Sequence, residues 1–260
     1  MKISILLPYK ENFSPSYAGA VSLFINDTLK ISKYKSITTV YGNTEYKNIF
    51  KLKYKNINLK KIFFQSQNKK YVEEFIKIEK KTKSNLIELH NRPIYLQYLT
   101  NKLKNKTYIL YFHNDPLTMN GSKKITDRIF LMKNCFKIIF NSNWSKRKFL
   151  EGMKIDHINS EKLIVINQSA QKSNVNLKSK KNIITFVGKL NKSKGYDIFG
   201  NAIIKVLNKH KKWSSIVVGD EPRDKIQFNH KKLVSLGTRS SVINTLDGLI
   251  SVCAKPNVCK

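Results

Sequence analysis

Residues 183–197 read IITFVGKLNKSKGYD, a short apolar run followed by a loop that two glycines bracket and that contains three lysines. The run Ile183–Val187 is rich in β-branched residues, which predicts a strand that is buried on both faces. From Asp197 onward, apolar residues recur at helical spacing. They are Ile198, Ala202 and Val206, with Ile203 and Leu207 beside them. The segment therefore predicts a strand, a cationic loop and a helix in that order.

A second apolar run at residues 216–218 ends in Gly219-Asp220-Glu221-Pro222 and completes a strand–helix–strand unit. Such units place the loop after the first strand at the carboxyl end of a parallel sheet, where ligands bind in open α/β folds. Lysines beside a helix N-terminus favour a phosphorylated ligand. On spacing alone, an ordinary basic loop explains the pattern equally well. The phosphate-binding patterns G-x-x-x-x-G-K-[ST] and G-x-G-x-x-G are both absent from the chain.

The phrase Val187-Gly188-Lys189-Leu190, followed by Lys194-Gly195, resembles the V-G-R-L…K-G segment of family 4 retaining glycosyltransferases. That family has the GT-B fold, in which two Rossmann-like α/β domains are joined in one chain. The resemblance implies that this segment opens the domain that binds the nucleotide-sugar donor. Lys189 and Lys194, with Gly188, would then contact the donor diphosphate. Lys189 stands where the family usually has arginine, so it keeps the charge but lacks the two-pronged grip on phosphate oxygens.

The composition is strongly basic, with a net charge of +32 over 260 residues, and 41% of the residues are hydrophobic. This length allows one large or two modest domains, each with a substantial core. Because lysine dominates the basic residues and asparagine and isoleucine are also abundant, we interpret the charge mainly as a compositional bias of the genome. It still attracts anionic membranes, nucleic acids and phosphorylated substrates.

The three cysteines include no C-x-x-C pair, which indicates a reduced compartment and neither a disulfide framework nor a zinc site. The apolar run at the N-terminus is too short for a signal peptide, and no stretch approaches the roughly 20 apolar residues of a membrane helix. We therefore expect a cytoplasmic protein that has no metal and no cofactor. Contact with the inner face of the cytoplasmic membrane is a further expectation from the charge.

The first half of the chain opens like a Rossmann-like domain, with a predicted strand at Ile3–Leu7, a loop and a helix that begins at Ala20. By the family resemblance, Gly19 in this loop would face the cleft, although a simple strand-to-helix turn fits as well. Further along, we predict a strand at 36–41, a short strand at 62–64 and a helix at 71–83. A further helix is introduced by Gly121-Ser122 and runs through Ile125, Ile129, Met132 and Asn134.

Two similar phrases follow two predicted strands of the first half. One strand ends in His90-Asn91 and the other in His113-Asn114, and we expect the nearby prolines at 93 and 116 to stop regular structure. Because carboxyl ends of parallel strands share one sheet edge, both histidines should point to the same crevice. In the resembling family a histidine at such a strand end faces the donor sugar. His113 is the better match and the predicted catalytic residue, and His90 is predicted to line the cleft. Hydrogen-bonded structural histidines are the alternative.

A predicted strand at 137–141 precedes Ser142, which we expect first as a helix N-cap and, by the resemblance, as a residue of the cleft wall. Glu221 would line the cleft in the second half. The predicted organisation is a first Rossmann-like domain over residues 1–170, a polar linker over 171–182 and a partial donor-binding domain over 183–260. The family's donor domain continues with two glutamates that are separated by seven residues, but this sequence has no glutamate after Glu221. We therefore expect an incomplete second domain and weak or absent transfer.

The predicted function is transfer of a sugar from a nucleotide-diphosphate-sugar to a glycan or lipid acceptor, such as lipopolysaccharide or another cell-envelope polysaccharide. By the resemblance, the anomeric configuration would be retained, and cations rather than a metal would stabilise the departing diphosphate. Two alternatives stay open. One is a basic protein that binds nucleic acid or an anionic surface, although no nucleic-acid recognition motif is present. The other is a sugar-nucleotide epimerase of the same fold.

Overall fold

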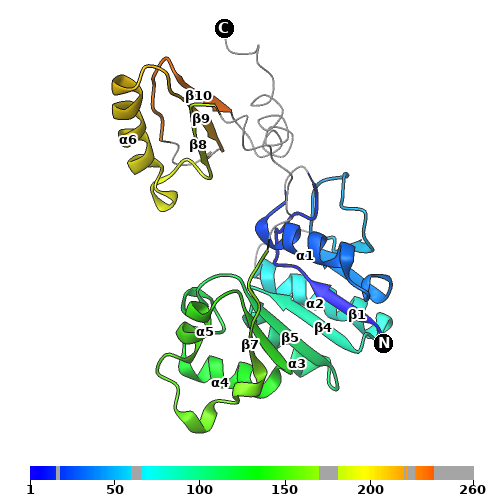
Figure 1. Ribbon diagram of the computed structural model, residues 1–260. Helices are drawn as coiled ribbons and strands as arrows, with labels where there is room; N and C mark the ends of the chain where they lie inside the picture. Colours follow the sequence, from blue (N-terminus) through cyan, green and yellow to red (C-terminus); the bar gives the residue numbers. More distant parts are fainter. Residues whose placement is uncertain (16–17, 60–65, 170–180, 220, 222–225, 237–260) are drawn as a thin grey trace. The chain divides into compact units, whose positions relative to one another are not determined.

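The computed structural model describes residues 1–15, 18–59, 66–169, 181–219, 221 and 226–236 (Figure 1). The chain divides into two compact units, Met1–Ala170 and Gln171–Lys260. Most of the predicted linker at 171–182 and the predicted short strand at 62–64 lie outside the described residues. Within the described ranges, every helix falls short of the length and apolar character that crossing a bilayer requires.

The first unit is a doubly wound α/β domain built on a seven-stranded parallel sheet of order β3-β2-β1-β4-β5-β6-β7. The strands are β1 Ile3–Leu6, β2 Thr38–Gly42, β3 Tyr54–Asn56, β4 Leu86–His90, β5 Thr107–Phe112, β6 Lys137–Phe140 and β7 Leu163–Val165. The α-helices are α1 Ala20–Ile31, α2 Gln67–Thr82, α3 Ile94–Lys102, α4 Ile125–Asn134 and α5 Asn143–Leu150. Short 3₁₀ turns are η1 Lys35–Ile37, η2 Pro116–Thr118, η3 Ile155–His157 and η4 Ser160–Lys162.

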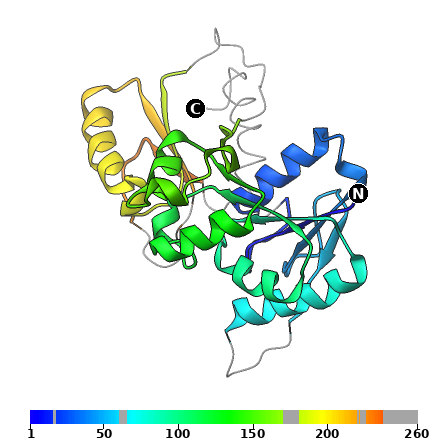
Figure 2. The ribbon, with the colours of Figure 1, turned by 90° about the horizontal axis from the view of Figure 1, so that it is seen from below.

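Alternating strand residues supply two cores, one on each face of this sheet. In β1, Ile5 packs with the buried face of α1, whereas its neighbour Leu6 packs with α2 and α3 on the other face. Figures 1 and 2 show α1 on one side of the sheet and α2 on the other. Because period-2 side chains of a strand point to opposite faces, a sheet covered on both sides needs near-continuous apolar strands. The middle of each central strand is therefore apolar and buried, and polar residues such as His90 stand where the strands end.

The prediction that the prolines stop regular structure was wrong. Pro93 caps helix α3, and Pro116 is the first residue of the 3₁₀ turn η2. Proline is tolerated in the first turn of a helix because the N–H group that it lacks has no partner there, and its fixed φ angle already suits the helix. Each proline therefore begins a new element directly after a strand and its histidine.

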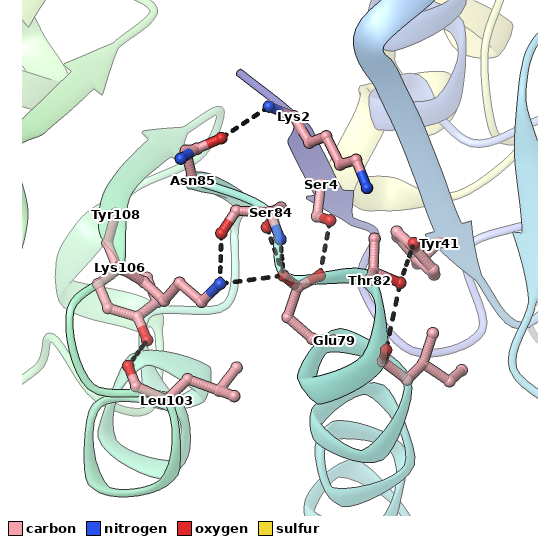
Figure 3. A network of polar contacts seen from close by, with 11 residues as sticks. Lys2, Ser4, Tyr41, Glu79, Thr82, Ser84, Asn85, Leu103, Lys106 and Tyr108 are labelled. Carbon is pink, nitrogen blue, oxygen red and sulfur yellow. Dashed lines mark hydrogen bonds and ion pairs between the residues drawn. The ribbon is translucent and has the colours of Figure 1, made fainter.

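A buried carboxylate ties together the amino end of the sheet (Figure 3). Glu79, near the end of α2, is fully buried and accepts hydrogen bonds from Ser4 Oγ at 2.7 Å and from the backbone N–H of Ser84 at 2.6 Å. The ammonium group of Lys106 lies 3.5 Å from the same carboxylate. These partners belong to β1 and to the residues that precede β4 and β5. A buried charge is tolerated only when it is paired and hydrogen-bonded, and Glu79 meets both conditions.

The second unit contains a parallel sheet of order β10-β9-β8 with one described helix. Its elements are β8 Ile183–Val187, the 3₁₀ turn η6 Lys192–Lys194, α6 Tyr196–Lys209, β9 Ser214–Val218 and β10 Leu233–Leu236. The predicted strand–loop–helix–strand unit is therefore confirmed. The predicted burial of β8 on both faces was wrong, because Val187 is 54% exposed and no residue of the strand is fully buried.

The apolar face of α6 also differs from the prediction. The buried residues of the helix are Tyr196, Gly200, Ile203 and Leu207, whereas Ile198 is 73% exposed. The helix is rotated because the ring of Phe228 lies against Gly200, where a side chain would collide with it. Phe228 also makes an edge-to-face contact with Tyr196 at 5.6 Å between ring centroids. An aromatic residue from a loop thus selects the buried face of the helix.

Candidate functional site

Two histidines meet at the carboxyl ends of β4 and β5. His90 is the last residue of β4 and pairs in register with Tyr111, whereas His113 directly follows β5. Nδ1 of His90 lies 2.8 Å from Nε2 of His113. Their rings are nearly parallel, at 20° with centroids 5.1 Å apart. The structure therefore brings together the two residues that the repeated phrase predicted at one sheet edge.

The contact between the histidines is the centre of a longer hydrogen-bonded chain. On one side, Nε2 of His90 lies 2.8 Å from a carboxylate oxygen of Glu88 on the same strand. On the other side, Nδ1 of His113 is hydrogen-bonded to Nε2 of Gln168, which follows β7. The order is thus Glu88, His90, His113, Gln168. Sequence reasoning missed both ends of this chain, because Glu88 reads as an ordinary strand residue and Gln168 lies 55 residues from its partner.

Aromatic rings enclose the two imidazoles. Tyr111 stacks on His90 at 4.8 Å and 13°, and Phe24 of α1 meets His113 edge-on at 5.0 Å. Burial, and to a smaller extent repulsion from His90, lower the pKa of His113 from 6.5 to about 3. His90 itself is fully buried. Of the two histidines, it is therefore His113 that a ligand would reach, with His90 behind it.

Two asparagines from neighbouring strands hold the backbone of His113. The side-chain oxygen of Asn91 accepts a hydrogen bond from the N–H of His113 at 2.8 Å, and the amide of Asn141 donates to its carbonyl at the same distance. Asn91 has a left-handed backbone, with φ of 51°, a conformation that asparagine tolerates better than most residues. The carboxyl ends of β4, β5 and β6 are thereby joined around one imidazole.

Ser142 follows this arrangement as the N-cap of α5, as predicted. Its hydroxyl accepts a hydrogen bond from the backbone N–H of Ser145 at 3.2 Å. The serine lies next to Asn141, so it stands beside the His113 site with its oxygen engaged in capping. Its predicted place in the cleft wall stays a prediction.

Gly19 accommodates a carboxylate of the protein itself. Gly19 is the N-cap of α1, and a Cβ atom at this position would collide with the carboxylate of Glu11. An oxygen of Glu11 accepts a hydrogen bond from the N–H of Ser22, in the first turn of α1, at 3.1 Å. Negative charge at a helix N-terminus is stabilising, and Glu11 supplies it here. The glycine thus makes room for an internal cap, a contact that no local sequence pattern signals.

The predicted phosphate-binding residues lie in one loop of the second unit. Gly188 and Lys189 follow β8, and Lys194 ends the turn η6 before α6. Gly219, after β9, approaches the carbonyl of Gly188 so closely that a side chain could not be accommodated. Asn191 of the loop donates a hydrogen bond at 2.9 Å to the buried carboxylate of Glu221. The hydrogen bond to Glu221 fixes the loop on its buried side. Both lysines are exposed, so their ammonium groups are accessible to a ligand in solvent.

A cavity of about 130 Å³ adjoins this loop. This volume is close to that of a cavity that accommodates one benzene molecule. Leu190 comes from the loop and Tyr196 from the first turn of α6. The other lining residues are Ile226, Gln227, Phe228, Asn229 and Ser235.

Within the described ranges of both units, no group of three or more histidine, cysteine, aspartate or glutamate side chains is arranged to hold a metal ion.

No protein-family model matches the sequence, and no curated protein matches it either. Solved structures do match, at low identity. The structure of HepE from Anabaena in complex with UDP is 15% identical, with a TM-score of 0.57, and covers 98% of this chain and 66% of its own. This chain therefore spans slightly less than two thirds of the HepE chain.

Two further structures agree with the first. The lipopolysaccharide outer core galactosyltransferase WaaB, in its apo form, is 14% identical, with a TM-score of 0.56 over 95% of this chain and 71% of its own. The UDP-GlcNAc 2-epimerase from Neisseria meningitidis, bound to UDP-GlcNAc, is 11% identical, with a TM-score of 0.57 over 95% of this chain and 75% of its own. At these identities the similarity establishes the fold. The chain has the predicted α/β fold of the GT-B type, with two Rossmann-like domains of which the second is only partly described.

Proposed function

We propose that this chain is a glycosyltransferase that takes a sugar from a nucleotide-diphosphate-sugar and transfers it to a glycan or lipid acceptor with retention of configuration. The observation that carries the proposal is the Lys189–Lys194 loop, which Glu221 anchors at the carboxyl end of β8 and β9. This is the sheet end at which open α/β folds bind their ligands. A fold relative was solved with UDP bound.

The proposed roles follow from charge. Lys189 and Lys194 would bind the diphosphate and stabilise the negative charge that develops as the sugar leaves, an electrostatic contribution to catalysis. Both ammonium groups are exposed, so they can reorient toward a ligand at small cost. His113 would face the donor sugar as a neutral imidazole, since burial keeps its pKa near 3.

For the acceptor, we propose an anionic glycan or lipid of the cell envelope, such as lipopolysaccharide, at the cytoplasmic face of the membrane. A net charge of +32 attracts such acceptors over distances comparable to the Debye length. The structural similarity to an outer core galactosyltransferase is consistent with this acceptor class.

The main rival is a sugar-nucleotide epimerase, because an epimerase of this kind is as similar in fold as the transferases are. The two activities give different products. A transferase releases UDP only when an acceptor is present, whereas an epimerase converts the UDP-sugar without one. Chromatography of UDP-sugars incubated with the protein, with and without envelope extract, separates the two.

Donor binding tests the proposal directly by calorimetry with UDP. Replacing Lys189 and Lys194 together by alanine should weaken binding at least tenfold. The matched control is the same change at Lys211 and Lys212, two exposed lysines in the turn before β9. Equal loss in both double variants would reduce the effect to net charge and count against the proposed site. Binding of random oligonucleotides that exceeds UDP binding, and that falls steeply with salt, would favour a nucleic-acid-binding protein.

A further inference from the structure

We propose that Glu88 and His90 are positioning residues that fix the tautomer of His113, so that its Nδ1 atom is an unprotonated acceptor for a hydroxyl group of a bound sugar. In the structure, the side-chain amide of Gln168 lies against Nδ1 of His113, at the position where that hydroxyl group would bind. The sugar as ligand rests on the proposed function, whereas the tautomer rests on the geometry of the described residues alone.

The direction of the hydrogen bonds follows from the chemistry of the first member. An ionised carboxylate can only accept hydrogen bonds, so the Nε2 atom of His90, 2.8 Å from Glu88, carries a hydrogen. A neutral imidazole has one donor and one acceptor, so Nδ1 of His90 is the acceptor. The hydrogen between the rings therefore belongs to Nε2 of His113, at 2.8 Å. Nδ1 of His113 is left with its lone pair.

The side chain of Gln168 can complete this arrangement, because its amide can turn either its nitrogen or its oxygen toward Nδ1 of His113. The side-chain amide nitrogen of Gln168 faces Nδ1 of His113, and an amide nitrogen is a donor only. The chain of donors thus runs in one direction, from Gln168 through the two histidines to Glu88. A hydroxyl group donates in the same way, so a sugar hydroxyl can replace the amide without disturbing any other member.

Burial differs between the two ends of this hydrogen-bonded chain: His90 is held in place by its surroundings, whereas Gln168 can be replaced by a ligand. His90 is fully buried and stacked on Tyr111, so its ring cannot turn over without breaking the packing. Gln168 is exposed and lies beyond the last strand of the first unit, so its side chain can leave at little cost. The low pKa of His113 supports the same view, because a neutral ring accepts a hydrogen bond over the whole physiological pH range.

Without Glu88 and His90, either tautomer of His113 would be satisfied, because the amide of Gln168 can turn over to accept instead of donate. With Glu88 present, the direction is the same whether or not a sugar binds. A change of tautomer in variants of Glu88 and His90 therefore tests their positioning roles, and a shift on ligand binding tests the sugar contact. The quantity to be measured is the tautomer of His113. Nitrogen-15 NMR of histidine reports it directly, because protonated and unprotonated ring nitrogens have well separated chemical shifts.

The first experiment uses the full chain labelled with nitrogen-15 in histidine, with the His113 signals assigned by the variant His113→Gln. We expect a hydrogen on Nε2 and none on Nδ1 between pH 6 and 8. Glu88→Gln should give a mixture of tautomers, because glutamine both donates and accepts. His90→Phe, which keeps a ring beside Tyr111, should do the same. The control is Glu74→Gln, the same change in an exposed ion pair of α2, which should leave the signals unchanged.

Two results would overturn the assignment of Glu88 and His90. One is a hydrogen on Nδ1 of His113 in the unchanged protein. The other is an unaltered single tautomer in both Glu88→Gln and His90→Phe, provided that each variant retains the thermal unfolding midpoint of the unchanged protein to within a few degrees. If either variant fails to fold, the remaining one decides.

The second experiment adds ligands to the labelled protein: UDP, UDP-glucose, UDP-galactose and UDP-N-acetylglucosamine. A bound UDP-sugar should move the Nδ1 signal of His113, UDP alone should not, and Gln168→Ala should leave the UDP-sugar effect intact. A UDP-sugar that binds by calorimetry but leaves the Nδ1 signal in place would overturn the sugar contact. If none of the nucleotides binds, the proposed function and the sugar contact both fail, while the tautomer experiment still decides the roles of Glu88 and His90.

Discussion

The Nδ1 atom of His90 lies 2.8 Å from the Nε2 atom of His113, although the two residues are 23 positions apart in the chain. The contact arises because β4 and β5 are adjacent parallel strands and each histidine stands where its strand ends. Parallel strands bring their carboxyl ends to one edge, so equivalent residues of two similar phrases become neighbours. The site is thus a direct product of the sheet order.

The low pKa of His113 predicts that the protein loses stability in mild acid. Its pKa is 6.5 in the unfolded chain and about 3 in the folded protein, so between these values the unfolded state binds a proton that the folded state does not. Stability from this group is complete above pH 6.5 and is lost as the pH falls toward 3. The expected slope is up to about 1.4 kcal/mol per pH unit.

Urea unfolding at several pH values measures this slope. His113→Gln should flatten it, whereas His157→Gln, which changes a histidine of the exposed turn η3, should leave it as it was. Identical slopes in all three proteins would show that His113 does not lose its proton on folding.

The buried carboxylate of Glu79 predicts a large stability loss on truncation. Glu79→Ala removes the acceptor of Ser4 and Ser84 and leaves Lys106 without its carboxylate, so that only the carbonyl of Ser84 still accepts from its ammonium group. Breaking a buried ion pair costs about 3–5 kcal/mol. Glu74→Ala in the same helix removes only an exposed pair, which solvent screens, and should cost far less than Glu79→Ala. The shift in urea midpoint compares the two, and similar shifts would refute a special role for Glu79.

The close approach of Glu11 to Gly19 predicts a coupled pair. Gly19→Ala forces the carboxylate away from the N–H group of Ser22, and losing this cap should cost about 0.5–2 kcal/mol of unfolding free energy. In the double variant with Glu11→Ala there is no carboxylate to collide with. Its loss of unfolding free energy should therefore be smaller than the sum of the losses in the two single variants. A double-mutant cycle measures this coupling. Strict additivity would mean that the two residues do not meet.

The hydrogen bond between Asn191 and Glu221 predicts an effect of loop position on donor binding. Asn191→Ala frees the loop that carries Lys189 and Lys194, and loss of one charge-assisted hydrogen bond is worth about 1.5–3 kcal/mol. Only part of this free energy is lost from UDP binding, because the loop can still adopt the binding conformation some of the time. We therefore expect UDP affinity, measured by calorimetry, to fall about 3–10-fold. Asn208→Ala, on the exposed side of α6, is the matched control. Unchanged affinity in Asn191→Ala would separate the loop from UDP binding.

Local patterns predicted much of the fold. The bounds of β8 were predicted because a β-branched run meets a glycine at residue 188, and α4 because its apolar spacing is regular. The buried face of α6 was not, since Ile203 and Leu207 fit two rotations of the helix and the choice depends on Phe228 from a distant loop. In the same way, α3 was missed because Pro93 reads as a stop although it begins a helix.

The site was predictable only as far as its histidines. They share a phrase and a place at strand ends, and both properties can be read along the chain. Glu11, Glu88 and Gln168 carry no such mark, because each acquires its meaning from a partner that folding brings near. Long-range hydrogen bonds of this kind depend on the arrangement of the strands and have no local signature.

The carboxylate of Glu11 occupies the first turn of α1, so this helix N-terminus is not available to bind an anion from outside. An incoming phosphate would meet negative charge at that helix start, and Phe24 of the same helix contacts His113, an imidazole without charge. This corner of the first unit therefore repels anions and suits uncharged polyols. The loop of the second unit that carries the exposed Lys189 and Lys194 has the opposite preference, because its charge favours anions.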